Sequence, residues 1–177
     1  GRALEVGYPL NFDLVGGFAE YRDLERHRML TQQRQKLSVE LGFIMPPEMK
    51  IVGLENEVTN VVEGIEDLNS DLKHNGLEEI SQYATLFNHR MRFMLGMNLR
   101  EFQHLSELRT QPAGHFSYRA MVMRMAEQLS QRDCWINLAT EFINFSDPGN
   151  KISRAKEQSR IAGENLACGI DSEIDFV

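Results

Sequence analysis

Apolar residues recur at alternating spacings of three and four between residues 51 and 72. Because an α-helix has about 3.6 residues per turn, this spacing puts them on one helix face. Asn75 and Gly76 follow the stripe and suit a left-handed helix cap. The pattern therefore predicts a long amphipathic helix that ends at this pair. The stripe consists of Ile51, Leu54, Val58, Val61, Ile65, Leu68 and Leu72.

Shorter elements are predicted on either side of this helix. Residues 8–17 mix turn-forming and apolar residues, which indicates a loop with one short strand. Residues 18–29 contain no Gly or Pro and can sustain a helix. Residues 77–86 have the pattern of a shorter helix, whereas residues 90–97 suit either a strand or a buried connector.

Three more helices are predicted towards the C-terminus. Asn98 can cap the first, because its side chain can accept a hydrogen bond from a free backbone amide, and this helix extends to about Thr110. The second covers residues 116–129; its methionines, Met121 and Met125, are assigned to the core or to a subunit interface. The third covers residues 135–143.

The composition is that of one ordinary soluble globular domain. The chain has 177 residues, of which 42% are hydrophobic and 25% charged. No apolar run approaches the ~18 to 20 residues of a membrane helix, and no signal-peptide pattern opens the sequence. We therefore expect a cytoplasmic protein with no membrane partner. Cys134 and Cys168 suit buried thiols rather than a disulfide framework, and the absent start methionine indicates a tag scar, an excised domain or a processed product.

The net charge of −7 is distributed unevenly along the chain. Residues 22–36 hold five bases against two acids, and residues 90–124 hold six bases against two acids, so these segments carry +3 and +4. An acidic protein thus contains two basic segments. They either converge to form an anion site or remain two separately solvated basic faces.

The first basic segment contains Arg26-His27-Arg28 at the end of a predicted helix. If the following residues form a strand, Arg34, Lys36 and Ser38 share one face of it. Guanidinium, ammonium and hydroxyl groups are the donors that phosphate oxygens need. The alternative is structural, because cations at a helix C-terminus also complement the helix dipole.

The second basic segment includes the helix that begins after Asn98. At about 100° per residue, Arg100 and His104 fall on one face, whereas Arg109 continues an apolar face. Arg109 is therefore either at the rim of the core or placed to meet an anion. A further cluster around His115 and Arg119 has either a capping and packing role or a ligand-binding one.

Several kinds of chemistry find no sequence support. No nucleophile stands beside a base, no HExxH or clustered acids indicate a metal site, and no glycine-rich phosphate loop is present. RNA binding is the least supported function, because the chain is acidic and has no basic–aromatic RNA-binding pattern. We therefore expect neither a metal nor a nucleic-acid partner.

Four segments, in this order and spacing, resemble the flavin-dependent thymidylate synthases, the ThyX family. They are Tyr21–Arg28 with its Arg-His-Arg motif, Ser81–Asn88, Arg92-Phe93 and Asn98–Arg109. The resemblance implies a helix-rich α+β fold with a small sheet packed by long helices. We assign this ThyX-like domain to residues 1–145 and a polar tail, with a marginal helix, to residues 146–177.

The resemblance also implies a function. Members of the family are homotetramers with FAD bound between subunits, and they convert dUMP to dTMP with methylenetetrahydrofolate as one-carbon donor and NADPH as reductant. Arg109 would be the catalytic residue, contacting the uracil ring. The flavin site would be lined by Arg26, His27, Arg28, Asn98, Arg100 and His104. The pyrimidine nucleotide would be bound by Asp23, Arg34, Lys36, Ser38, Gln82 and Arg109.

Departures from the family pattern leave two hypotheses open. Lys36 stands where the motif usually has serine, and Gln82 where it has a nucleotide-binding arginine. The loss at Gln82 weakens phosphate binding unless Arg34 or Arg119 compensates. The chain is thus either a divergent ThyX-like enzyme or a non-catalytic ThyX-like module, such as the C-terminal half of a duplicated chain, that serves assembly or nucleotide and flavin binding.

Overall fold

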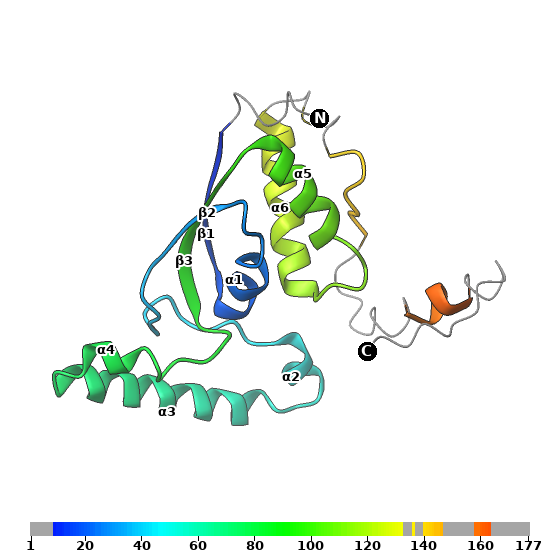
Figure 1. Ribbon diagram of the computed structural model, residues 1–177. Helices are drawn as coiled ribbons and strands as arrows, with labels where there is room; N and C mark the ends of the chain where they lie inside the picture. The colour runs from blue at the N-terminus through cyan, green and yellow to red at the C-terminus, as the bar shows by residue number, and fades with distance from the viewer. Residues whose placement is uncertain (1–8, 133–135, 137–139, 147–157, 164–177) are drawn as a thin grey trace, which may run out of the picture. The chain divides into compact units, whose positions relative to one another are not determined.

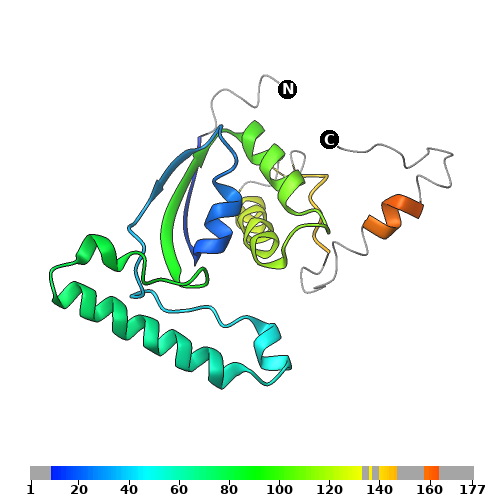
Figure 2. The same cartoon turned by 60° about the horizontal axis from the view of Figure 1, so that its bottom comes forward.

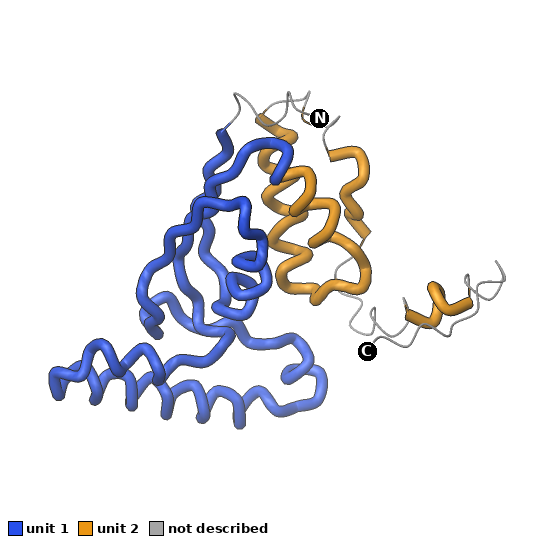
Figure 3. Tube along the Cα trace, in the orientation of Figure 1, with its two compact units in different colours: residues 1–101 blue, residues 102–177 orange. Residues whose placement is uncertain are grey.

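The computed structural model describes residues 9–132, 136, 140–146 and 158–163. The chain divides into two compact units, residues 1–101 and 102–177 (Figure 3). Each unit is considered by itself below. The predicted domain boundary after residue 145 stays a prediction. Of the predicted helix at 135–143, residues 135 and 137–139 lie outside the described residues, and residues 140–143 form a turn rather than a helix, so the prediction is wrong there. Most of the tail also lies outside the described residues, but residues 158–163 are helical and exposed.

The first unit contains a three-stranded antiparallel sheet with the strand order β1-β3-β2 (Figure 1). Strand β3 (Arg90–Met97) is central, between β1 (Leu10–Gly17) and the short β2 (Thr31–Arg34). Its alternate residues Phe93 and Leu95 are buried, and its backbone pairs with a strand on each side, so this segment is a strand rather than a connector. A small sheet among helices confirms the expected α+β class.

The prediction of a loop at residues 8–17 is wrong for most of its length. Asn11 and Asp13 are turn formers in isolation, yet in β1 they alternate with Phe12 and Leu14 and pair with the central strand. Non-local pairing with β3 therefore overrides their local preference for turns.

Helix α1 (Phe18–Leu24) is shorter than predicted. It packs on the sheet, with the rings of Tyr21 and Phe93 5.1 Å apart in an edge-on contact. The helix ends at Leu24, whose carbonyl accepts a hydrogen bond from His27 N at 3.1 Å, and the chain then turns into β2. The Arg-His-Arg motif therefore lies in a turn, not at the end of a helix.

The long predicted helix is confirmed as α3 (Glu55–His74), preceded by α2 (Pro47–Ile51) and followed by α4 (Glu78–Ser81). Helix α4 lies alongside α3 in both views (Figures 1 and 2). Asn75 is the C-cap and Gly76 has φ +76°, as the sequence predicts. The apolar stripe is only partly covered, because Val61 and Leu68 remain 58% and 48% exposed.

Helix α5 (Leu99–Arg109) begins at the end of the first unit and continues into the second, where α6 (Phe116–Arg132) follows. Asn98 caps α5 as predicted: its Oδ1 accepts a hydrogen bond from Glu101 N at 2.9 Å. Met125 is buried in the core, and Met121 is half-buried. None of the helices in the described ranges is both long and apolar enough to span a membrane.

Candidate functional site

The Arg-His-Arg turn of the first unit directs its three side chains to different environments. His27 is buried, with 6% of its surface exposed, whereas Arg26 and Arg28 are exposed on either side of it. The turn thus presents two guanidinium groups to solvent while its middle residue is anchored inside.

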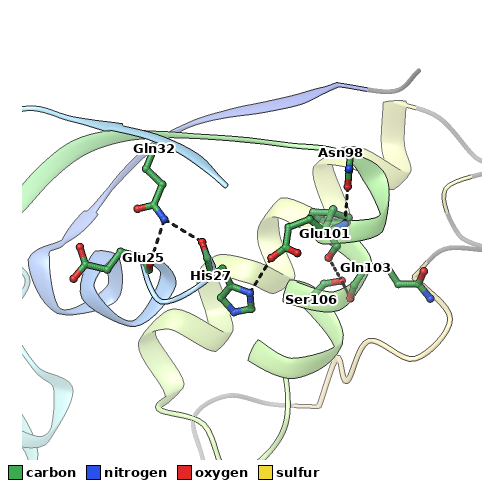
Figure 4. Close-up of polar contacts among 8 residues, drawn as sticks. Glu25, His27, Gln32, Asn98, Glu101, Gln103 and Ser106 are labelled. Atoms are coloured by element: carbon green, nitrogen blue, oxygen red, sulfur yellow. Dashed lines mark hydrogen bonds and ion pairs between the residues drawn. The ribbon is translucent and has the colours of Figure 1, made fainter. Parts of the chain in front are cut away.

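Gln32 on β2 holds the backbone of this turn (Figure 4). Its Nε2 donates to the carbonyl oxygens of Glu25 and His27, each at 3.2 Å. Its Oε1 accepts a hydrogen bond from the Tyr21 hydroxyl at 3.4 Å. Burial, followed by the nearby charge of Glu25, raises the pKa of Tyr21, which keeps this hydroxyl protonated. Both ends of the Gln32 amide therefore have partners, the NH₂ group in the turn and the oxygen on α1.

Glu101 on α5 holds the ring of His27. The distance from His27 Nδ1 to Glu101 Oε1 is 3.1 Å, and the two side chains are only 4% and 11% exposed. Glu101 lies in the first turn of α5, where the helix dipole favours a carboxylate, and its backbone is fixed by the Asn98 cap. Asn98, an expected flavin ligand, thus uses its side-chain oxygen to cap the helix.

Sequence reasoning missed both Gln32 and Glu101. For Glu101 a signal was present, since Asn98 and Glu101 have the spacing of a capping box. Gln32 carries no such signal, because a glutamine in a short strand is unremarkable until the turn folds over it.

The other predicted residues around α1 and β2 are exposed or half-buried. Arg26 Nη2 forms an ion pair with Asp23 Oδ1 at 3.3 Å, so Asp23 accompanies a guanidinium. Arg34 extends over the ring of Tyr21, with Cζ 6.0 Å from the centroid. Because β2 ends at Arg34, the expectation that Arg34, Lys36 and Ser38 share a strand face is wrong.

Lys36 and Gln82 do lie together, but around an acid. Lys36 Nζ forms an ion pair with a carboxylate oxygen of Glu79 on α4, and this contact raises the pKa of Lys36. Gln82 Nε2 donates to the other Glu79 oxygen at 3.3 Å, and Gln82 Oε1 accepts from Leu37 N at 3.3 Å. The predicted phosphate set therefore includes a carboxylate that sequence reasoning did not foresee.

The remaining predicted residues lie on α5, with Arg100 and His104 exposed. In the second unit, Arg109 is half-buried, and its guanidinium lies over the ring of Tyr118 with Cζ 5.5 Å from the centroid. This position at the end of the buried face agrees with a rim residue and also leaves it able to meet a ligand.

Arg119 has a packing role rather than a ligand-binding one. It is 1% exposed, and its Nε donates to the Thr110 carbonyl at 3.1 Å while Nη2 donates to Ser146 Oγ at 3.2 Å. It therefore does not stand in for the arginine replaced by Gln82. His115 Nδ1 accepts from Ser117 N at 3.3 Å at the start of α6, a capping role.

The exposed positive charge on the Arg-His-Arg turn is the feature of the first unit best suited to binding an anion. Arg28 and the Asp23-paired Arg26 expose guanidinium groups, the type of donor that a diphosphate or another polyanion requires. Within the described ranges, no three His, Cys, Asp or Glu side chains gather to hold a metal ion.

Comparisons with known proteins give a family match and similar sequences. Residues 10–133 match the family model described as thymidylate synthase complementing protein. The chain is 33% identical over 149 residues to a UPF0159 protein of Chlamydia muridarum, covering 84% of this chain and 28% of that protein. It is 31% identical over 169 residues to a UPF0159 protein of Thermoplasma acidophilum, covering 92% of this chain and 34% of that protein.

The chain therefore spans about a third or less of the length of these curated relatives. The family match covers well over half of the chain and includes the Arg-His-Arg turn, the capped start of α5 and Arg109. On the strength of this match, the chain belongs to the family of thymidylate synthase complementing proteins, the ThyX family.

Proposed function

We propose that this chain binds FAD and takes part in the methylation of a pyrimidine nucleotide, dUMP to dTMP in the family it belongs to. The methylene group of methylenetetrahydrofolate would be transferred to carbon 5 of the uracil ring, in place of the hydrogen there. The flavin, when bound, supplies the two electrons that reduce the transferred carbon to a methyl group, and NADPH replenishes them.

The observation that supports flavin binding is the braced Arg-His-Arg turn. With His27 held inside by Glu101, Arg26, which also pairs with Asp23, and Arg28 are exposed on either side of it and would contact the flavin diphosphate. Arg100, exposed in the first turn of α5, is a candidate for the rest of the cofactor site in this unit, and His104 stays a predicted flavin ligand. The family's homotetramer would complete such a site between subunits.

Arg109 is the proposed catalytic residue. A guanidinium that contacts the uracil ring would stabilise negative charge that develops on a ring oxygen during attack at carbon 5. Its stacking on Tyr118 restricts the side chain, which lowers the entropy cost of presenting it to a substrate.

A second candidate, a non-catalytic nucleotide- or flavin-binding module, is favoured by one observation. Glu79 pairs with Lys36 and Gln82, so the predicted phosphate site contains a negative charge. A carboxylate opposes phosphate binding, and the chain would then serve assembly within a longer protein or sensing of a ligand.

Reconstitution with FAD tests the flavin proposal. Purified protein should take up FAD, recognised by its visible absorption and quenched fluorescence, and should oxidise NADPH faster when dUMP is added. Protein that takes up no FAD would contradict the proposal. Complementation of a strain that lacks thymidylate synthase separates the two candidates, because growth without thymidine rules out the non-catalytic module.

A further inference from the structure

We propose that Gln32 is the positioning residue of the flavin-binding turn: it orients Arg26 and Arg28 for the bound anion without contacting the anion itself. This inference rests on the proposed function, but the conformational part can be tested without any cofactor. Gln32 is not among the residues that the family resemblance assigns to the site.

The geometry indicates control of backbone direction. The carbonyls of Glu25 and His27 belong to the peptide units on either side of Arg26-His27, and one Gln32 amide group bonds both at 3.2 Å. Because each peptide unit is planar, holding these two carbonyls holds the planes of the 25–26 and 27–28 peptide units. The Cα–Cβ directions of Arg26 and Arg28 are thereby restricted.

Gln32 itself is held in one orientation. Its NH₂ group must face the turn, because the two carbonyls there can only accept, and its Oε1 then accepts a hydrogen bond from the Tyr21 hydroxyl at 3.4 Å. Tyr21 is 6% exposed and packs edge-on against Phe93 of the central strand. Tyr21 and Gln32 therefore connect the turn to the sheet.

Glu101 acts on a different part of the same turn. It contacts the His27 ring, whereas Gln32 contacts the backbone carbonyls. Without Gln32, His27 can thus stay buried, but the backbone no longer holds Arg26 and Arg28 in their directions. This division predicts a local effect on the turn rather than unfolding of the unit.

The test uses Gln32→Leu, which removes the hydrogen bonds at similar size, and Gln32→Glu, which keeps the length and removes the donor. Gln35→Leu is the matched control, since Gln35 is an exposed glutamine three residues further along. In Gln32→Leu, amide exchange in residues 25–29 should rise about tenfold, and the Kd for FAD should also rise about tenfold. Gln32→Glu should be at least as impaired, and Gln35→Leu should match the wild type.

A double-mutant cycle separates positioning from general stability. In an Arg28→Ala background, Gln32→Leu should weaken FAD binding less than in the wild type, because one of the two groups that it positions is gone. Equal effects in both backgrounds would overturn the proposal, as would unchanged exchange at residues 25–29. Uptake of no FAD by the wild type would contradict the proposed function, and the exchange measurement would still decide whether Gln32 orders the turn.

Discussion

Glu101 Oε1 lies 3.1 Å from Nδ1 of His27, across 74 residues of sequence, with both side chains nearly buried. A buried histidine ring needs a hydrogen-bond partner, and a carboxylate, which is ionised at neutral pH, forms a stronger hydrogen bond than a neutral group does. This contact ties the start of α5 to the Arg-His-Arg turn of the first unit. It explains why the middle residue of the motif is inside and the two arginines are outside.

Replacing Glu101 should therefore destabilise the fold. Glu101→Ala leaves the buried ring nitrogen without this partner, and we expect a loss of about 1–3 kcal/mol in the free energy of unfolding. Glu101→Gln retains an acceptor and should lose less. Urea denaturation measures both, with the exposed Glu57→Ala on α3 as control. Equal stability of Glu101→Ala and the wild type would show that the contact contributes nothing.

Asn69 should be essential for the packing of α4 on α3. It is 1% exposed, and its Nδ2 donates to the carbonyls of Ser81 at 2.7 Å and Ala84 at 3.2 Å. Asn69→Leu would leave two buried carbonyls without this donor, so we expect a loss of about 2 kcal/mol by urea denaturation. Asn60→Leu, at an exposed position of the same helix, should change stability far less.

Two glycines should respond to alanine with opposite signs. A Cβ atom would meet nothing within 4 Å at either Gly64 or Gly76, but only Gly76 has a positive φ, +76°. Gly64→Ala in the middle of α3 should stabilise the protein by about 0.5–1 kcal/mol. Gly76→Ala should destabilise it by about 1 kcal/mol, because alanine is strained in that conformation. Thermal melts of the two variants provide the comparison.

The stability of the protein should fall as the pH drops below about 6.5, the ordinary pKa of histidine. Burial lowers the pKa of His89 despite the nearby carboxylate of Glu66. Its Nδ1 accepts a hydrogen bond from Leu86 N at 2.8 Å and so is unprotonated in the folded state. Below that pH the unfolded state binds the proton more readily, which favours unfolding.

His89→Gln removes this titration. The variant should lose less stability than the wild type between pH 6.5 and the lowered pKa, whatever its stability at neutral pH. The lowered pKa values of Glu40 and Asp13, due to hydrogen bonds with Lys73 and Arg92, act only at more acidic pH. Parallel pH profiles of wild type and variant would contradict the assignment to His89.

Glu79 should limit nucleotide binding at the predicted phosphate set. Glu79→Gln removes the charge that pairs with Lys36, so the affinity for dUMP should rise about two- to fivefold. Lys36→Gln should lower it. Calorimetric titration gives both values, with Glu63→Gln on α3 as control. An unchanged affinity in Glu79→Gln would place the nucleotide phosphate elsewhere.

Much of this organisation was predictable from local sequence. The seven-residue stripe and the Asn75-Gly76 pair predicted α3 and its end, and Asn98 predicted the start of α5, because helix periodicity and caps involve residues a few positions apart. The resemblance likewise depended on motif order, and it identified the family that residues 10–133 match.

Long-range contacts decided the rest. Strand β1 exists because β3 pairs with it, and α1 stops at Leu24 because the turn is held by Gln32 and His27 by Glu101. The sequence by itself determined the long helix α3, the capped start of α5 and which family the chain resembles. Only the tertiary structure decided that Arg26 and Arg28 face outward and that Lys36 meets an acid, because side-chain partners distant in sequence leave no periodic signal.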